Sequence, residues 1–158
     1  MVRRGARERP YQIELLCDHH QIDGFDCGHP ELNDELRRRV SPFYDPDEGM
    51  VLAGVVDGVV VGYLVLVDVL FQLENEGKEE RCFYLAYLGV DQSYRGSSLA
   101  GDLVRRAYEV RRQRRKRRKT YAAMIVNTYY NEELIDRVTG QRFKRLPGNS
   151  YLWYKRSG

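Results

Sequence analysis

The clearest pattern of hydrophobic and polar positions lies within residues 84–110. This segment begins with YLAYLGV, which has no polar group other than the tyrosine hydroxyls and is typical of a strand covered on both faces. After a stretch of small residues, Leu99, Leu103, Ala107 and Val110 recur at helical spacing and would form one buried stripe. The pattern therefore predicts a strand, a turn and a helix, in that order.

Shorter patterns on either side predict the other elements. Pro30 is at a position suited to the first turn of a helix, and Leu32 and Leu36 would share one face of that helix. Asp57-Gly58 between two β-rich runs is a strong signal for a two-residue hairpin. The expected strands are 11–16, 50–56, 59–71, 82–90, 120–126, 143–146 and 151–155, the expected helices are 30–40, 99–110 and 131–138, and the acidic segment 72–81 is expected to be a loop.

The turn before the helix at residue 99 has the composition of an anion-binding site. Its sequence, RGSSLA, places small side chains where the first backbone N–H groups of a helix have no partner inside the helix. A phosphate can approach these N–H groups, and the positive end of the helix dipole attracts it. A glycine-containing turn without a ligand has the same pattern, so both interpretations stay open. The candidate phosphate-binding residues are Arg95, Gly96, Ser97, Ser98, Leu99 and Ala100.

Composition narrows the class of protein. A chain of 158 residues, 42% hydrophobic and 31% charged, is typical of one folded domain, which we expect to span residues 1–158. No run approaches the roughly 20 apolar residues that span a bilayer, and the basic N-terminus lacks the apolar core of a secretory signal. We therefore expect a cytoplasmic protein without a membrane partner.

The cysteines do not indicate a disulfide framework, because there are only three of them, Cys17, Cys27 and Cys82. Cys17-x-His19 and Cys27-x-His29 repeat one spacing, and thiolates and imidazoles are zinc ligands. The Cys-x-x-Cys and His-x-x-x-His spacings that mark zinc sites do not occur. We therefore expect buried thiols, surface histidines and no metal.

The charge of the chain is concentrated in one place. Eight of the 26 basic residues lie in Arg111 to Lys119 (RRQRRKRRK), so that the rest of the chain has 18 basic and 23 acidic residues and a net charge of −5. Such a patch on an otherwise acidic body usually meets a polyanion, most commonly a nucleic acid. The alternative is a solvated end of a long helix.

The turn at residues 95–100 resembles the acetyl-coenzyme A site of the GNAT acetyltransferase superfamily, where [Q/R]-x-x-G-x-[G/A] follows a strand. Arg95 and Ala100 match the outer positions, while Ser98 stands where the family usually has glycine, so that the loop opens or its hydroxyl becomes a donor. The expected order of elements is also that of the family over residues 11–156. The resemblance implies an α/β GNAT fold, with a central mixed, mostly antiparallel sheet of six to seven strands, flanking helices and a splay between two parallel strands.

The same resemblance implies where the acetyl thioester would lie. The strands that end near Val90 and Val126 would be the parallel pair, and the slot between them would hold the pantetheine arm. The backbone N–H of Leu88 or Val90 would then face the acetyl carbonyl and stabilise the developing oxyanion. Direct attack by a neutral, well-placed amine would complete the transfer.

The last expected helix departs from the family pattern N-x-x-A-x-x-F-Y-x-x-x-G-F. Asn131 matches the asparagine that holds the pantetheine, but Val138 stands where the tyrosine that returns a proton to the thiolate is usual. Tyr129 and Tyr130 are the nearest phenols in the sequence and become the candidates for this role, with ordinary half-buried aromatic side chains as the alternative. Loss of general acid assistance typically slows a reaction by about 10²–10⁴-fold without abolishing it.

A second resemblance is more specific. The segment 25–38 (FDCGHPELNDELRR) is similar to the pattern F-x-C-G-x-x-x-L-[N/D]-x-[F/W]-L, which opens a GNAT subgroup, the toxins of bacterial toxin–antitoxin pairs that acetylate aminoacyl-tRNA. Glu35 replaces the usual aromatic residue. The matching residues are Phe25, Cys27, Gly28, Leu32, Asn33 and Leu36.

These resemblances imply an acetyl-CoA-dependent N-acetyltransferase acting on a primary amine, with the α-amino group of aminoacyl-tRNA as the favoured acceptor. Arg111 to Lys119 would contact the tRNA, and an antitoxin protein and a homodimer are possible partners. Two alternatives remain open. One is a small-molecule or protein N-acetyltransferase, for which the basic run is incidental or contacts an acidic protein. The other is a degenerate GNAT that binds coenzyme A or RNA without catalysis, which Ser98 and Val138 motivate.

Overall fold

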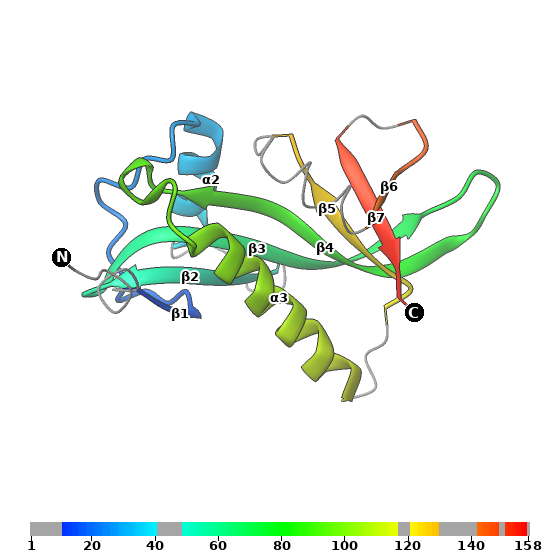
Figure 1. Ribbon diagram of the computed structural model, residues 1–158, viewed down its shortest axis with the longest axis horizontal. Coiled ribbons are helices and arrows are strands. Elements are labelled where there is room, and N and C mark those ends of the chain that lie inside the picture. Colours follow the sequence, from blue (N-terminus) through cyan, green and yellow to red (C-terminus); the bar gives the residue numbers. More distant parts are fainter. Residues whose placement is uncertain (1–10, 41–48, 117–120, 130–141, 149–150, 158) are drawn as a thin grey trace. The chain divides into compact units, whose positions relative to one another are not determined.

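The computed structural model describes residues 11–40, 49–116, 121–129, 142–148 and 151–157, with the side chains of 115 and 116 excepted. Its strands form one mixed sheet with the order β1-β2-β3-β4-β5-β7-β6 (Figure 1). The strands are β1 (Gln12–Leu15), β2 (Met50–Val56), β3 (Val59–Gln72), β4 (Glu79–Val90), β5 (Ala123–Asn127), β6 (Lys144–Arg145) and β7 (Leu152–Arg156). The helices are α2 (Pro30–Arg39), the 3₁₀ turn η2 (Gln92–Tyr94) and α3 (Leu99–Lys116).

Most of the predicted elements are confirmed. Asp57 and Gly58 have φ values of 50° and 81°, as a type I′ hairpin turn between β2 and β3 requires. Helix α2 begins at Pro30 and buries Leu32 and Leu36. The stripe on α3 is also confirmed at its first three positions, which are buried, whereas its last position is half-buried. The expected helix 131–138 lies outside the described residues.

The prediction of a loop over residues 72–81 is wrong at both ends, because β3 extends to Gln72 and β4 begins at Glu79. Arg156 of β7 lies 3.1 Å from a carboxylate oxygen of Glu80 and 3.1 Å from one of Glu74. The guanidinium of Arg156 offsets the repulsion between these two carboxylates. Its hydrogen bond to Glu80 lowers the pKa of that carboxyl group. The sequence pattern could not reveal this arginine, since it lies 76 residues from Glu80.

The chain divides by packing into two compact units. The first comprises Met1–Val65 and Tyr87–Ala107, and the second comprises Leu66–Ala86 and Tyr108–Gly158. Strands β3 and β4 and helix α3 contribute residues to both units. The expectation of a single domain stays a prediction, and each unit is described by itself below. No helix among the described residues is long and apolar enough to cross a membrane.

The first unit joins α2 to its strands through a buried tyrosine. The hydroxyl of Tyr63 on β3 donates to the carbonyl oxygen of Leu32 on α2 at 2.6 Å. The ring of Tyr63 fits because Gly89 on β4 has no side chain, and a Cβ there would lie 2.9 Å from the ring. Phe25 meets the same ring edge to face, with 5.8 Å between the centroids. Burial of these apolar groups fixes the segment that leads into α2.

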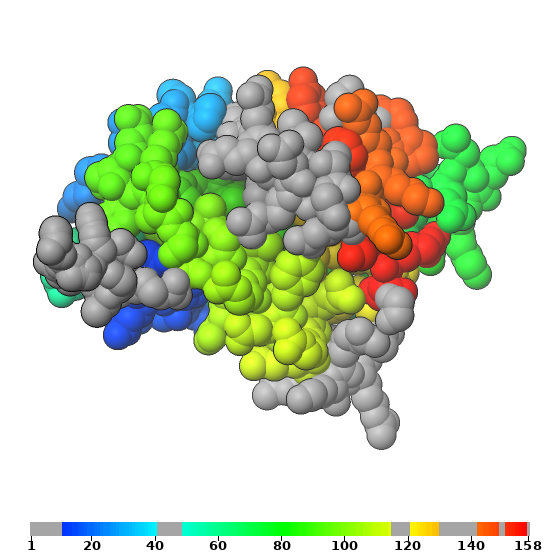
Figure 2. Space-filling model, viewed as in Figure 1, coloured from blue at the N-terminus to red at the C-terminus, as the bar shows by residue number. Residues whose placement is uncertain are grey.

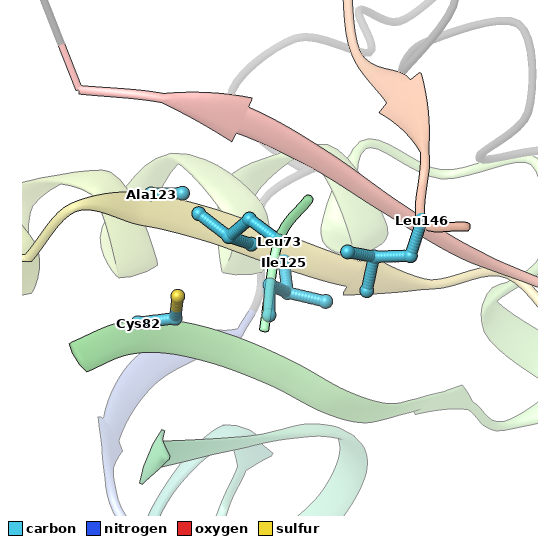
Figure 3. Close-up of a cluster of buried hydrophobic side chains, with 5 residues drawn as sticks. All are labelled: Leu73, Cys82, Ala123, Ile125 and Leu146. Carbon is cyan, nitrogen blue, oxygen red and sulfur yellow. The ribbon is translucent and has the colours of Figure 1, made fainter. Parts of the chain in front are cut away.

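The second unit contains the parallel pair of strands. Strand β4 pairs with β5 in parallel from Cys82↔Ala123 to Leu85↔Val126 and then continues to Val90, whereas β5 ends at Asn127. The predicted parallel pair is therefore confirmed, and β5 pairs on its other side with antiparallel β7. Buried side chains of β4 and β5, together with the residues directly after β3 and β6, form the core of this unit (Figure 3): Leu73, Cys82, Ala123, Ile125 and Leu146.

Candidate active site

The turn between β4 and α3 is held by side-chain hydrogen bonds to its own backbone. The carboxylate of Asp91 accepts hydrogen bonds from the backbone N–H and the hydroxyl of Ser93, at 2.9 and 2.7 Å. Ser97 Oγ donates to the carbonyl oxygen of Tyr94 at 2.6 Å and accepts the backbone N–H of Leu99 at 3.2 Å. Helix α3 begins at Leu99, as the sequence pattern predicts. Ser97 therefore contacts one of the N–H groups that the pattern assigned to a phosphate.

Gly96 leaves this turn open on one side. Its φ of 81° lies in the left-handed region, which glycine adopts without strain. A Cβ built at Gly96 would have no heavy atom within 4 Å. The space beside the backbone at this point is what a pyrophosphate needs in order to approach the start of a helix.

Two glycines on neighbouring strands set the position of the start of α3. A Cβ at Gly54 on β2 would lie 2.6 Å from the side chain of Leu99, and one at Gly62 on β3 would lie 2.7 Å from it. Leu99 is fully buried in the space that these glycines leave. The first turn of α3 can therefore lie closer to the sheet than a side chain on either strand would permit.

Ser98 is fixed by a hydrogen-bonded group that the sequence pattern did not reveal. Its Oγ lies 2.7 Å from Tyr11 Oη and donates to Asp102 Oδ2 at 3.3 Å, and Tyr11 donates to the same carboxylate oxygen at 2.6 Å. Tyr11 and Asp102 are buried. Ser98 stands where related sequences usually have glycine, and its hydroxyl forms contacts within the first unit. These contacts join Tyr11, the residue before β1, to the first turns of α3. Arg105 pairs with the other carboxylate oxygen of Asp102 at 2.6 Å.

The segment Phe25–Gly28 braces this turn. The backbone N–H of Asp26 donates to the carboxylate of Asp91 at 3.0 Å, and the carbonyl oxygen of Asp26 accepts from the N–H of Gln92 at 2.9 Å. The guanidinium of Arg95 donates to the carbonyl oxygen of Cys27. Arg95 was predicted from the turn at residues 95–100 to bind the cofactor. Its side chain instead contacts the segment Phe25–Gly28.

The other residues of this motif have local structural roles. Gly28 has a φ of 90°, and a Cβ there would lie 2.8 Å from the guanidinium of Arg95. Asn33 accepts the N–H of Cys27 at 3.0 Å and donates to the carboxylate of Asp26 at 3.1 Å. Glu35, which replaces the usual aromatic residue, pairs instead with an arginine that follows it on α2 at 3.0 Å. The motif thus supports the turn that precedes α3.

The two aspartates of this brace have lowered pKa values. The pKa of Asp26 is lowered first by the backbone N–H of Gly28 and then by the side chain of Asn33. For Asp91, burial raises the pKa, but hydrogen bonds from the backbone of Asp26 and from Ser93 outweigh it, so that the pKa lies below its ordinary value. Both carboxylates are therefore ionised at neutral pH and accept these hydrogen bonds.

The residues expected to act on the acetyl thioester lie at the end of β4 and directly after β5. Leu88 is buried and Val90 is half-buried at the end of β4, and their role as oxyanion donors stays a prediction. Tyr129 in the second unit is 52% exposed and meets Tyr151 edge to face, with 4.6 Å between the ring centroids. Its backbone N–H donates to the side chain of Asn127 at 2.9 Å. Tyr130, Asn131 and Val138 lie outside the described residues.

The basic run begins within α3, where its first residues are described. Arg112 is exposed, and the second half of α3 lies at the surface in Figure 2. Arg114 is different, because its guanidinium lies 2.9 Å from Asp68 and 3.1 Å from the hydroxyl of Tyr121, 5.6 Å from the ring centroid of Phe83. One member of the run is therefore part of the packing of the second unit.

The fold and the site together define a class of protein. The mixed sheet contains the parallel pair of β4 and β5, and a turn of small residues leads from β4 into α3. Residues 13–136 match the Acetyltransferase (GNAT) family. The chain belongs to this family, and acetyl-coenzyme A is its acyl donor. The open backbone at Gly96 and the small side chains of Ser97 and Ser98 fit the pyrophosphate of that donor.

Several solved structures with a similar fold are of toxin–antitoxin proteins. The structure of the KacTA–DNA complex has a TM-score of 0.77 and 24% identity, covering 92% of this chain and 92% of that chain. AtaT complexed with acetyl-methionyl-tRNAfMet has a TM-score of 0.76 and 20% identity, covering 92% and 94%. AtaTR bound with AcCoA has a TM-score of 0.76 and 20% identity, covering 93% and 94%. At these identities, the likeness concerns the fold. No curated protein sequence matches this chain.

Proposed function

We propose that this acetyltransferase acts on the α-amino group of aminoacyl-tRNA. The observation that carries the proposal is the basic run of Arg111 to Lys119, which has no acidic residue within it and whose first six residues form the end of α3. A polyanion is the partner that such a run fits, because each phosphate contact releases counterions. Two features of other proteins support this choice. The FDCG segment resembles that of tRNA-acetylating toxins, and AtaT, which has a similar fold, was solved with acetyl-methionyl-tRNAfMet.

The acetyl group would be delivered from the turn that precedes α3. Backbone N–H groups of residues 96–100, other than those of Ser97 and Leu99 that are bonded within the turn, would hold the pyrophosphate, and the bound donor supplies an activated thioester. The amine of an aminoacyl ester has a modest pKa, so that little general-base help is required. Leu88 or Val90 would offer a backbone N–H to the carbonyl oxygen, Asn131 would hold the pantetheine, and Tyr129 or Tyr130 would return a proton to the leaving group.

An antitoxin is the protein partner that goes with this proposal. AtaT was also solved with the C-terminus of the antitoxin AtaR, and the KacTA structure contains DNA. A short upstream open reading frame for a DNA-binding protein would support such a partner here. Transfer to aminoacyl-tRNA would also require a cytoplasmic location. If the acceptor is instead a small molecule or a protein, the basic run is incidental and tRNA binding will be weak at every salt concentration.

The proposal is tested by filter retention of tRNA between low and physiological salt. The affinity should fall linearly in log salt, with a slope of about −0.7 to −0.9 per phosphate contact. Arg112→Glu should weaken binding and reduce the slope by about one contact or more, because this side chain is exposed. Arg37→Glu is the matched control, since Arg37 is also exposed and lies on α2 outside the run. Equal effects of both variants, or no RNA affinity at low salt, would contradict the proposal.

A further inference from the structure

The segment after β1 brings together three side chains that can bind a transition metal. Cys17, His19 and His20 each offer a ligand atom, and these atoms all lie within 4.8 Å of one another. Cys17 Sγ is 3.1 Å from Nδ1 of His19 and 3.5 Å from Nδ1 of His20. Sulfur and nitrogen ligands at about 2.3 and 2.0 Å from tetrahedral zinc are separated by about 3.5 Å. Both histidine nitrogens therefore already lie at about the zinc-ligand spacing from Cys17 Sγ.

The tautomer of His20 is suited to coordination through Nδ1. Its Nε2–H donates to a carboxylate oxygen of Glu14 on β1 at 2.5 Å, and its Nδ1 accepts the backbone N–H of Cys17 at 3.1 Å. The lone pair of Nδ1 consequently points towards the backbone N–H of Cys17, and a metal bound at Nδ1 would take the place of this hydrogen bond. A carboxylate that accepts the other ring N–H is the usual partner of a metal-binding histidine, because it fixes the ring and raises its basicity. The side chain of His20 is only 1% exposed, so this orientation is held by packing.

The space beside the two histidines is open to solvent. A pocket of about 410 Å³ is lined in part by Glu14, His19 and His20. Cys17 is half-buried and its thiol is free of disulfide bonds. Three protein ligands with access to water make a zinc site whose fourth position is taken by a solvent molecule.

We propose that Cys17, His19 and His20 form a zinc site in which Glu14 positions His20. The sequence spacing led us to expect no metal and surface histidines, but His20 is buried. The second copy of the Cys-x-His spacing does not contribute to this site. Cys27 is buried, its thiol donates to Asn33 at 3.2 Å, and it belongs to the segment that braces the turn before α3. The adjacent pair His19-His20 supplies the ligands instead. Bound zinc would fix the segment between β1 and α2.

The test is titration of the full-length protein, freed of metal by chelation, with Zn²⁺ and with Co²⁺ as a spectroscopic probe. One Zn²⁺ should bind per chain with micromolar or tighter affinity and raise the melting temperature by mass action. Co²⁺ should give a thiolate-to-metal charge-transfer band, which requires a cysteine ligand. Zinc should also protect Cys17 from alkylation by iodoacetamide.

Variants distinguish the site from adventitious binding. Cys17→Ser should abolish the Co²⁺ thiolate band, and His19→Ala, at an exposed position, should weaken Zn²⁺ binding at least tenfold. Glu14→Ala should weaken it by about 10–100-fold, because a positioning carboxylate is lost. His29→Ala is the matched control and should bind as wild type does. Retention of the thiolate band in Cys17→Ser, equal losses in His29→Ala and His19→Ala, or no stoichiometric binding of Zn²⁺ would overturn the proposal. Far-UV circular dichroism of each metal-free variant shows that it is folded.

Discussion

The hydroxyl of Tyr11 donates to the carboxylate of Asp102 at 2.6 Å, across 91 residues of sequence. Both side chains are buried, and Ser98 Oγ lies 2.7 Å from the same hydroxyl. The group joins the residue before β1 to the first turns of α3. In the proposed site, backbone N–H groups within residues 96–100 bind the pyrophosphate and must be held in a fixed arrangement. We therefore expect the contact of Tyr11 to affect the affinity for acetyl-coenzyme A.

Tyr11→Phe should therefore lower both stability and affinity. The variant leaves the buried carboxylate of Asp102 without one donor, which typically costs about 1–3 kcal/mol of unfolding free energy. Urea unfolding and calorimetric titration with acetyl-coenzyme A measure the two effects. Tyr94→Phe is the control, because its ring contacts Tyr11 edge to face at 6.4 Å and the substitution also removes one hydroxyl. If Tyr11→Phe and Tyr94→Phe behave alike, the contact with Asp102 does not support the turn.

This contact illustrates how much of the site was predictable. The turn and the start of α3 follow from local composition, because small residues before a helical stripe signal both. The hydrogen bond between Tyr11 and Asp102 was not predictable from the sequence pattern, because it joins two segments that are far apart in the sequence. The FDCG motif was recognised from its letters, but its role as a brace required the hydrogen bonds of Asp26 and Arg95.

Gly54→Ala should displace the start of α3. The added Cβ would lie 2.6 Å from a terminal carbon of Leu99, which is fully buried and must move. Overpacking of this kind costs about 1–3 kcal/mol of unfolding free energy, and we expect weaker binding of acetyl-coenzyme A with it. The strand pattern of β2 did not predict this constraint, because a glycine in a strand does not disclose which side chain lies over it.

Leu99→Ala provides the control for this prediction. Alone it should cost about 2–5 kcal/mol through the cavity it leaves. In combination with Gly54→Ala the loss should be smaller than the sum of the single losses, since the new methyl group enters the vacated space. Additive losses in urea unfolding would show that the two residues do not interact.

A charge placed at Gly96 should exclude the pyrophosphate. Asparagine and aspartate both tolerate the left-handed backbone that Gly96 has, so Gly96→Asn and Gly96→Asp should be strained to a similar extent. They differ in one negative charge, which would face the diphosphate. We expect the Kd for acetyl-coenzyme A to rise at least about tenfold more in the aspartate variant, or about 1.4 kcal/mol. Equal affinities by calorimetry would place the pyrophosphate elsewhere.

The brace should weaken in acid. The pKa of Asp91 lies below its ordinary value of 3.8. A carboxylate whose pKa falls on folding stabilises the folded protein fully at pH values above the pKa of the unfolded state. This stabilisation is lost as the pH falls through the lower, folded pKa. Asp91→Asn should thus be less stable than wild type at neutral pH, and the two should begin to converge below about pH 4.

Urea midpoints between pH 7 and pH 2 measure this convergence. Asp57→Asn is the matched control for the loss of one negative charge, because asparagine is accepted at the positive φ of this hairpin position. A difference between wild type and Asp91→Asn that stays constant over the whole range would show that the hydrogen bonds of Asp91, rather than its charge, are what matters.

The strand pairing could be anticipated from the sequence, but the ion pairs of the basic run could not. The parallel pair of β4 and β5 was implied by the resemblance to the GNAT family, and it is confirmed. Arg114 was expected to contact tRNA with the rest of the basic run, but it pairs with Asp68 on β3, 46 residues away. Charge runs do not disclose which members are paired, because an ion pair of this kind depends on tertiary structure.

The central claim is that the acceptor is an aminoacyl-tRNA. Its most direct test is the transfer of radiolabelled acetyl groups from acetyl-coenzyme A to a panel of charged tRNAs, with each tRNA uncharged and each amino acid free as matched controls. We expect transfer to at least one charged tRNA with a kcat/KM at least about 100-fold above that of its free amino acid, and none to the uncharged tRNA. Transfer to free amines at an equal or higher kcat/KM, or no transfer to any charged tRNA, would contradict the claim.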